Sequence, residues 1–483
     1  MTATSDAWPL VVDLDGTLTP TDTLWESLLT LARRSPLRML CLPLWLLRGR
    51  AAFKHQVAAA GPLATEHLPV NERLFIFLQA EHAAGRRIVL ATAAHRSIAE
   101  PIAARLGLFS LVLASEEGNN LKGRAKLAAI TQAVGPDFVY AGDSRADLPI
   151  WQAARAAVLV NVSNGVRREL GSTVPVEREF KAPDGGWSTW ARALRVHQWL
   201  KNSLLFVPLL TAFSVDDGVR WQALAVAFAA FCLAASATYI GNDLWDLEND
   251  RGHPRKRQRP FAAAALPIPQ GLAAAAVLLV LAFALASQAS TAFVWVLLLY
   301  LVATTAYSLR LKEYVLVDVV MLSLLYTLRI IAGAVAVNIV VSSWLLAFSA
   351  FAFLSLALVK RCSELVTMAD LGRSESRGRD YRVGDLAVLW PLGVGASMAA
   401  VVVFGLFIST PETQARYASP QLLWGVAVTL VYWMGRMWIK TSRGEMHDDP
   451  LVYAVKDRAS RYALTFMLLT VLAAQWFRMV PTA

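Results

Sequence analysis

Two groups of residues in this sequence have the types and the spacing that phosphate chemistry requires. The first is DLDGT at Asp13–Thr17, where two carboxylates stand two residues apart after a short apolar run. Water attacks a phosphate monoester poorly, and a carboxylate nucleophile divides the reaction into two easier steps. A second carboxylate close by can protonate the leaving oxygen and then activate water. Asp13 and Asp15 therefore predict a phosphatase centre, and an ordinary turn with two capping aspartates is the alternative.

The second group is NDLWDLENDRGHPRKRQRP at 242–260. Asn242, Asp246 and Asp250 recur every four residues, so they form one stripe along a helix. The helix follows a long apolar stretch, and carboxylates at a membrane helix end are costly unless they are paired or bound to a metal. Their oxygens are the ligands that Mg²⁺ prefers. The stripe predicts a magnesium–diphosphate site, whereas a cytoplasmic loop obeying the positive-inside rule explains only the basic residues that follow.

Candidate substrate-binding residues accompany the stripe. His253, Lys256 and Arg259 offer positive charge for phosphate oxygens. The remaining candidates are Lys201, Asn202, Tyr307, Lys312, Asp318, Arg329, Lys360 and Arg361. Arg329 lies among apolar residues of a predicted span, where a charge indicates function. For Lys360 and Arg361, a simple anchor at a helix end explains the sequence equally well.

The elements that must position Asp13 are strands. Three short apolar runs end in polar residues and alternate with helical stretches, which predicts an open α/β sheet. They lie at 8–16, 86–94 and 137–144. Ligands of such sheets bind beyond the carboxyl ends of the strands, so Asp13, Thr92 and Asp143 should converge. A helical insert between the first two strands predicts a cap. Its apolar centre, Met39–Leu47, is flanked by basic residues and suits either an interfacial helix on anionic lipid or a helix packed on its own domain.

The rest of the chain is predicted to be an all-α polytopic bundle. About nine stretches are apolar and long enough to span a bilayer. They lie near 203–216, 222–241, 271–286, 291–308, 315–337, 343–360, 388–408, 421–440 and 462–479. We therefore expect a soluble domain at 1–185, an amphipathic junction at 186–202 and a membrane domain at 203–483.

Charge and cysteine content narrow the function classes. The net charge of +10 comes largely from short loops between apolar stretches, which indicates cytoplasmic loops rather than nucleic-acid binding. The three cysteines show no metal-ligand or disulfide pattern. The beginning of the chain lacks a signal-peptide pattern. We expect a multi-pass inner-membrane protein with its soluble domain in the cytoplasm.

The soluble part resembles the haloacid dehalogenase (HAD) superfamily over roughly residues 1–180. The resemblance rests on DLDGT, Thr92, Lys126 in NLKGRAKLAAI and GDSRAD at Gly142–Asp147, in that order. It implies a Rossmann-type parallel sheet with a helical cap. It also implies that Asp13 is the nucleophile, Asp15 the acid and base, and that Thr92 and Lys126 hold the phosphoryl group, with Lys122 as the alternative lysine. The implied Mg²⁺ ligands are Asp13, Asp15, Asp143 and Asp147.

The membrane part, roughly 190–480, resembles the UbiA superfamily of intramembrane prenyltransferases, whose first motif is N-x-x-x-D-x-x-x-D. The resemblance implies a nine-helix bundle that binds Mg²⁺ through Asn242, Asp246 and Asp250. In place of a second Asp-x-x-x-Asp motif stands YSLRLKEYVLVD at Tyr307–Asp318. Together with HQWLKN at 197–202 and LRIIAGA, this is similar to the decaprenyl-phosphate phosphoribosyltransferase branch.

That branch implies two substrates, phosphoribosyl pyrophosphate (PRPP) and a polyprenyl phosphate. The product would be a phosphate monoester, which the attached phosphatase is suited to hydrolyse. The alternative is a prenyltransferase that uses a polyprenyl diphosphate and an aromatic or lipid acceptor, with an independent phosphatase. A transporter with a regulatory phosphatase is disfavoured, because the charges cluster at span ends and no inverted repeat is evident. Whether the chain forms a homo-oligomer is left open.

Overall fold

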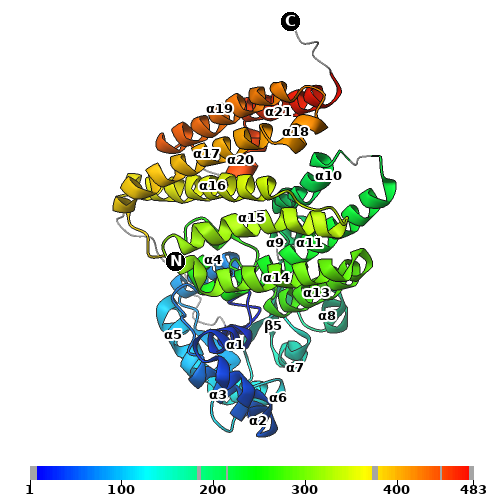
Figure 1. Cartoon of the computed structure of the whole chain (residues 1–483). Coiled ribbons are helices and arrows are strands. Elements are labelled where there is room, and N and C mark those ends of the chain that lie inside the picture. The colour runs from blue at the N-terminus through cyan, green and yellow to red at the C-terminus, as the bar shows by residue number, and fades with distance from the viewer. Residues whose placement is uncertain (1–7, 182–185, 214–215, 373–378, 447–448, 478–483) are drawn as a thin grey trace, which may run out of the picture. The chain divides into compact units, whose positions relative to one another are not determined.

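The computed structural model describes residues 8–181, 186–213, 216–372, 379–446 and 449–477. They form two compact units, each shown in Figure 1. The N-terminal unit comprises Met1–Leu194 and Tyr239–Ala276, and the C-terminal unit comprises Arg195–Thr238 and Val277–Ala483. The segment Tyr239–Ala276, which the sequence assigns to the membrane domain, therefore packs with the N-terminal unit.

A six-stranded parallel sheet forms the centre of the N-terminal unit. Its strands are β1 (Leu10–Val12), β2 (Ile88–His95), β3 (Leu111–Ser115), β4 (Val139–Gly142), β5 (Ala156–Val160) and β6 (Val176–Phe180). Their order is β3-β2-β1-β4-β5-β6. The three predicted strands correspond to β1, β2 and β4, and β1 is bonded to both of the others. The carboxyl ends of β1 and β4, which precede Asp13 and Asp143, are thus neighbours, and Thr92 lies within the adjacent strand β2.

Helices cover both faces of this sheet, which explains why β1, β4 and β5 are buried throughout rather than at alternate residues, whereas the edge strand β6 is charged and mostly exposed. Leu10 and Val12 contribute to one buried cluster, while Val11 contributes to another. The helices of the two buried clusters are α4 (Glu72–Ala83), α5 (Arg96–Leu106), α6 (Arg124–Val134), α7 (Leu148–Ala153) and α8 (Asn164–Leu170). The same unit contains α1 (Thr23–Arg34), which packs against the cap, and α9 (Trp187–Ala193). The predicted α/β sheet is therefore confirmed.

The predicted cap contains a 3₁₀ helix η1 (Pro36–Cys41) and two helices, α2 (Leu42–Leu47) and α3 (Arg50–Ala60). None of the residues of η1 or α2 is buried. The exposed leucines are Leu37, Leu40, Leu44, Leu46 and Leu47. Packing on its own domain does not bury this segment, and the interfacial helix stays a prediction.

Seven helices in the described part of the chain are long and apolar enough to cross a membrane. Their spans are Gly218–Trp245 (α11), Ile268–Ala289 (α13), Thr291–Leu309 (α14), Val317–Ala336 (α15), Ser343–Asp370 (α16), Val383–Ile408 (η6 and α17) and Pro420–Ser442 (η7 and α19). The predicted stretch 462–479 overlaps another helix, α21 (Arg458–Trp476). The predicted stretch 203–216 instead contains the end of η3 (Val196–Phe206) and a short α10 (Val207–Thr211). The predicted count of nine is therefore approximate.

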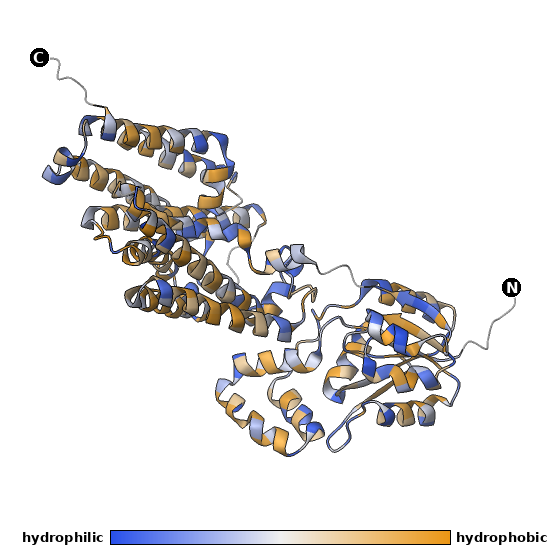
Figure 2. Ribbon diagram, turned by 90° about the vertical axis from the view of Figure 1, so that its right-hand side faces the viewer, coloured by the Kyte–Doolittle hydropathy of each residue, from blue (hydrophilic) through white to orange (hydrophobic). Residues whose placement is uncertain are grey.

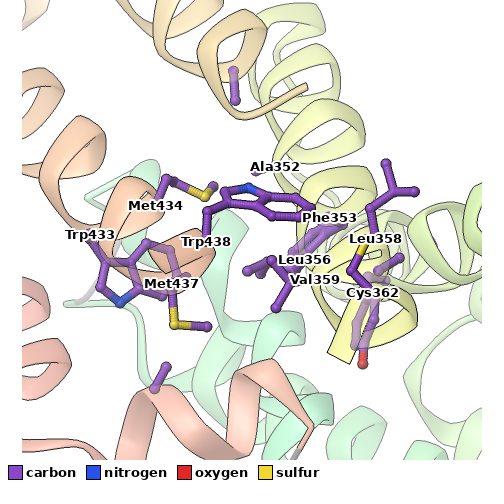
Figure 3. Close-up of a cluster of buried hydrophobic side chains, with 14 of the residues drawn as sticks. Ala352, Phe353, Leu356, Leu358, Val359, Cys362, Trp433, Met434, Met437 and Trp438 are labelled. Atoms are coloured by element: carbon purple, nitrogen blue, oxygen red, sulfur yellow. The ribbon is translucent and has the colours of Figure 1, made fainter. Parts of the chain in front are cut away.

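Apolar side chains dominate these helices (Figure 2). The core of the C-terminal unit lies between α16 and α19, where Trp438 packs near Phe353 and Leu356 (Figure 3). The indole N–H of Trp438 donates to Ser355 Oγ at 3.1 Å, so its one polar atom is satisfied. This core holds α16 in place, and α16 carries Lys360 and Arg361.

Candidate active sites

Asp13 follows the last residue of β1 and is buried beside two neighbouring strands. Its backbone N–H donates to Ala141 O of β4 at 3.0 Å, which fixes the residue at the carboxyl edge of the sheet. One carboxylate oxygen accepts from the Leu14 N–H at 2.8 Å. The other lies 2.8 Å from Lys126 Nζ at the start of α6. Lys126 therefore contacts Asp13 directly, and its predicted role in holding the phosphoryl group stays a prediction.

A hydrogen-bonded network fixes Lys126 and Asp147. Lys126 Nζ donates to the hydroxyl of Tyr140 at 3.0 Å, and that hydroxyl donates to Asp147 Oδ1 at 2.8 Å. Asp147 Oδ2 accepts from the backbone N–H and the hydroxyl of Ser144 at 3.1 and 3.0 Å. Because each buried polar group has a partner, these side chains are held in position before any substrate binds. Tyr140 is a supporting residue that the sequence analysis did not single out.

The three carboxylates Asp13, Asp143 and Asp147 offer oxygens that all lie within 4.8 Å of one another. Asp143 approaches the Asp13–Thr17 loop at Gly16, where an added Cβ would lie 2.1 Å from Asp143 Oδ2. Gly16 also has φ +75°, which side chains other than glycine rarely adopt. This glycine therefore permits the close approach. The donor set is all oxygen, which fits Mg²⁺.

The electrostatics of the cluster support a bound cation. Burial, together with the nearby carboxylates of Asp147 and Asp13, raises the pKa of Asp143 to about 8. Burial also raises the pKa of Asp13, against the opposing effect of Lys126. Crowded, buried carboxylates disfavour their own ionisation, and a divalent cation would relieve this.

Asp15 points to the other side of the site. Its Oδ1 accepts from the Thr23 N–H at 2.9 Å, at the start of α1. Burial, together with the carboxylate of Asp22, raises the pKa of Asp15 to about 7. The side chain can therefore hold a proton near neutral pH, which a general acid requires. Asp15 is not part of the oxygen cluster of Asp13, so its predicted role as a metal ligand is unsupported by this geometry.

A cavity of about 450 Å³ opens at these residues. Asp13, Asp15, Lys126, Asp143 and Asp147 all line it, whereas the fully buried Thr92 does not and its hydroxyl accepts from the Ala94 N–H. Lys122 also lines the cavity, but Lys126 is the lysine that contacts Asp13.

The cap adds Lys54, which the sequence analysis missed. Its Nζ donates to Ala93 O at 2.7 Å and to Asn120 Oδ1 at 3.2 Å, and the residue lines the cavity. Burial lowers the pKa of Lys54. Nothing in the cap sequence indicated that this one lysine points toward the sheet. Its position gives the cavity a third lysine, beside Lys122 and Lys126, for phosphate oxygens.

The predicted membrane stripe lies at the end of α11 and in α12 (Leu247–Arg251), within the N-terminal unit. The Asp246 N–H donates to Asn242 O at 2.9 Å and the Asp250 N–H donates to Asp246 O at 2.8 Å, so helical spacing continues through the stripe. Arg259 contacts Asp250 at 2.6 Å and Asp243 at 3.1 Å. Asp243 is a buried acid that the sequence analysis missed, although its seven-residue distance from Asp250 places both near one helix face.

The residues of the stripe are spaced along one helical path. Among described residues, only Asp13, Asp143 and Asp147 form a group of three metal-ligand side chains. Residues eight apart on a helix are separated by about 12 Å along its axis. The oxygen donors of the stripe fit Mg²⁺ in type, and their spacing fits an extended ligand such as a metal–diphosphate better than a single bare ion.

The basic residues after the stripe differ in their environments. Arg259 is half-buried and held by carboxylates, while His253 and Lys256 are exposed. His253 Nδ1 accepts from the backbone N–H groups of Arg255 and Lys256 at 3.2 and 3.3 Å, which caps the short turn η4 (Lys256–Gln258). His253 thus has a local structural role, and its binding of substrate stays a prediction.

Within the C-terminal unit, a buried carboxylate brings two candidate lysines together. Asp449 Oδ2 lies 2.7 Å from Lys201 Nζ and 3.8 Å from Lys360 Nζ. The hydroxyl of Tyr326 is 3.5 Å from the same oxygen. Asp449 caps α20 (Pro450–Lys456) and comes from a segment far from either lysine. The sequence analysis missed it because this pairing exists only in the folded chain.

Arg329 is buried at a close contact between α15 and η3. Its Nε donates to Asn202 Oδ1 at 3.0 Å, and its other nitrogens donate to Leu325 O at 2.6 Å and to the Tyr300 hydroxyl at 3.2 Å. Four residues on, an alanine Cβ at Gly333 would lie 1.9 Å from Leu205 O. Gly333 therefore lets η3 approach α15 so that Asn202 reaches Arg329.

Asp318 and Arg361 pair with one another in the interior of the C-terminal unit. Both are almost fully buried, and the Tyr381 hydroxyl also donates to Asp318. A buried ion pair of this kind holds α15 to α16. The half-buried Tyr307 and Lys312 lie at the end of α14 and in η5 (Leu311–Glu313). Substrate binding by these four residues stays a prediction.

The fold and the two sites define a membrane transferase joined to a HAD-type hydrolase. Two protein-family models agree: the UbiA prenyltransferase family matches residues 203–456, and haloacid dehalogenase-like hydrolase matches residues 10–152. The chain belongs to the UbiA prenyltransferase family and carries an N-terminal HAD-like domain. It is a multi-pass membrane protein. Both families typically depend on a divalent metal.

Three relatives place the chain more closely. A Sinorhizobium fredii protein designated y4nM is 38% identical over 94% of this chain and 88% of its own length. The nodulation protein NoeC of Azorhizobium caulinodans is 37% identical over 56% of this chain and 88% of its own length. The decaprenyl-phosphate phosphoribosyltransferase of Mycolicibacterium smegmatis is 34% identical over 45% of this chain and 69% of its own length.

Proposed function

We propose that the chain transfers 5-phosphoribose from PRPP to a polyprenyl phosphate and then removes the 5-phosphate of the product. The similarity of the C-terminal half to decaprenyl-phosphate phosphoribosyltransferases carries the choice of donor and acceptor. The product of that transfer is a phosphate monoester, which is the kind of substrate that the carboxylate site of the N-terminal unit suits. The two sites thus perform successive steps on one lipid.

In the first step, the bond between ribose C1 and the diphosphate breaks, and a bond from C1 to an oxygen of the lipid phosphate forms. Asn242, Asp246 and Asp250 would hold Mg²⁺, which neutralises charge on the departing diphosphate. Arg259 lies next to this stripe and would contact the diphosphate oxygens. The acceptor phosphate is already anionic, so no general base is needed. Lys201 and Lys360, which lie 2.7 and 3.8 Å from Asp449 in the C-terminal unit, would bind a further phosphate group.

In the second step, the Asp13 carboxylate attacks the 5-phosphate, and the bond from phosphorus to O5 of the ribose breaks. Asp15 gives its proton to O5, consistent with its raised pKa. Water then attacks the aspartyl-phosphate, Asp15 takes the proton of that water, and inorganic phosphate leaves. Lys126 stabilises charge on the phosphoryl oxygens, and Mg²⁺ at Asp13, Asp143 and Asp147 would neutralise the same charge.

Both sites are proposed to face the cytoplasm of an inner-membrane protein, where PRPP would be available. Joining them in one chain raises the effective concentration of the second site near the first product. The effective concentration is raised most for a lipid-linked intermediate, because such an intermediate stays in the same membrane as the enzyme.

A comparison of two donor substrates tests the proposal. Purified full-length protein in detergent is given Mg²⁺, decaprenyl phosphate and either PRPP or a polyprenyl diphosphate with an aromatic acceptor. We expect diphosphate release with PRPP, and we expect Asp246→Asn to abolish this release while the matched control Asp380→Asn, at an exposed aspartate, retains it. Consumption of the prenyl diphosphate in preference to PRPP would overturn the proposed reaction.

A further inference from the structure

A buried ion pair joins the phosphatase helix α1 to the segment that carries the membrane stripe. Arg251 contacts Glu26 through two nitrogens, at 3.0 Å to Oε2 and 2.6 Å to Oε1. The two side chains are only 7% and 4% exposed. A bidentate arginine–carboxylate pair of this kind has a defined geometry and is shielded from water. All of these residues belong to the N-terminal unit.

Glu26 connects this pair to the catalytic loop. Its Oε1 accepts from the Thr21 hydroxyl at 2.6 Å, and it lies in the first turn of α1. The N–H of Thr23, at the start of the same helix, holds Asp15. The carboxylate that receives Arg251 is therefore fixed to the backbone that positions the general acid.

Arg251 connects the pair to a second wall of the phosphatase cavity. Its Nε donates to Ala262 O at 3.2 Å, so the loop after α12 is tied to the same guanidinium. Four residues later, Leu266–Pro269 line the cavity that contains Asp13 and Asp15. A weaker contact between Arg33 and Glu248, at 3.3 Å, supports the same attachment. The transferase sequence thus supplies part of the phosphatase pocket.

The chemistry of this wall is apolar. Leu266 and Ile268 are hydrocarbon side chains, and Pro267 and Pro269 have no backbone N–H to donate. From the HAD-like domain, Leu24, Trp25 and Val57 line the same cavity. Such surroundings add little to the binding free energy of a small polar sugar phosphate. For a phosphate that carries an apolar group, the removal of that group from water favours binding.

We propose that Leu266–Pro269, positioned by Arg251 and Glu26, is the specificity-determining wall of the phosphatase and selects phosphate monoesters attached to an apolar chain. This inference rests on the proposed phosphatase activity and extends it, because the polyprenyl part of the lipid-linked intermediate, beyond its ribose, would pack on the wall, and a soluble sugar phosphate has no such part. Arg251 acts as a positioning residue and does not contact the substrate. The role of the wall does not depend on which donor the transferase uses.

Alkyl phosphates of different length test the wall without any transferase reaction. Full-length protein is assayed for hydrolysis of ethyl phosphate, hexyl phosphate and ribose 5-phosphate. We expect kcat/KM for hexyl phosphate to exceed that for ethyl phosphate about tenfold, since partial burial of four more methylenes is favourable. In Ile268→Ser and Arg251→Met this ratio should fall toward one, through a raised KM for hexyl phosphate. Arg251→Lys should restore part of it.

Arg255→Met is the matched control, because Arg255 is an exposed arginine of the same basic loop. It should keep the hexyl-to-ethyl ratio of the unmodified chain. A variant that is merely unstable loses activity on all three substrates equally, and its melting temperature identifies it. An unchanged ratio in both Ile268→Ser and Arg251→Met overturns the proposed wall. Failure of the unmodified chain to hydrolyse any of the three overturns the phosphatase itself, and a chain that hydrolyses them without chain-length preference overturns the wall alone.

Discussion

The two candidate sites gather their carboxylates in different ways. At the soluble site, Asp13 follows β1 while Asp143 and Asp147 follow β4, and the three carboxylates meet within one ligand-sized group. At the membrane stripe, Asn242, Asp246 and Asp250 follow one another along a single helical path. A parallel sheet brings distant residues to one edge, whereas a helix separates its own residues by a fixed rise. We therefore expect the first arrangement to bind a single ion and the second to bind an extended ligand.

Removal of the soluble nucleophile should give the largest effect. In Asp13→Asn, we expect phosphatase kcat to fall by at least about a thousandfold, because the covalent step is lost. Diphosphate release by the transferase should stay normal. Hydrolysis of p-nitrophenyl phosphate and release of diphosphate from PRPP measure the two activities. Asp137→Asn, which alters an exposed ion pair with Arg155, is the control and should leave both unchanged. Loss of both activities in Asp13→Asn would contradict the independence of the two chemistries.

The reciprocal change should affect only the transferase. In Asp250→Asn we expect diphosphate release to fall about 100-fold or more. The variant lacks one carboxylate that would hold the Mg²⁺, and this ion would neutralise the charge on the departing diphosphate. Arg259→Gln should lower it as well, since Arg259 bridges Asp250 and Asp243. Quantifying diphosphate against time checks both variants. Full turnover in Asp250→Asn would mean that the stripe does not hold the departing group.

Titration with Mg²⁺ compares the metal requirement of the two candidate sites. The phosphatase activity should reach half its maximum at a lower Mg²⁺ concentration than the transferase activity. The three phosphatase carboxylates already lie together, whereas the stripe is proposed to bind the ion together with diphosphate. After removal of metal with EDTA, the two activities of the same sample are followed as Mg²⁺ is restored. A single midpoint for both activities would argue against two differently built sites.

A smaller effect is expected at the contact that places Asn202 beside Arg329. Gly333→Ala puts a methyl group against Leu205 O, so we expect a loss of about 1–3 kcal/mol in stability and a weaker transferase. Gly395→Ala, in α17, meets nothing within 4 Å and is the matched control. Thermal unfolding in detergent compares them. Equal melting temperatures for the two variants would contradict the close approach of η3 and α15.

Periodicity explains why much of the fold could be predicted. Strand ends at Asp13 and Asp143 follow from short apolar runs, and the long helices follow from uninterrupted apolar length. Pairings between distant segments have no comparable signal. Asp449 with Lys201, and Arg251 with Glu26, require the folded chain to be recognised. Lys54 is one of many basic residues in the cap, and its direction depends on how α3 packs.

Domain boundaries show the same limit. Hydropathy places 239–276 in the membrane part, because apolar stretches lie on either side of it. Buried contacts instead attach this segment to the N-terminal unit, through Arg251 and through Leu244 and Leu247, which lie near α1 at a small cavity. A local average of hydropathy carries no information about which partner buries a residue.

Analysis of the lipid product tests most directly whether the two sites act in sequence. The full chain and its Asp13→Asn variant are incubated with ribose-labelled PRPP, decaprenyl phosphate and Mg²⁺, and the extracted lipids are identified by mass spectrometry. We predict decaprenyl-phosphoryl ribose and free inorganic phosphate from the unmodified chain, and the 5-phosphorylated lipid from Asp13→Asn. The same dephosphorylated lipid from both proteins would contradict the account.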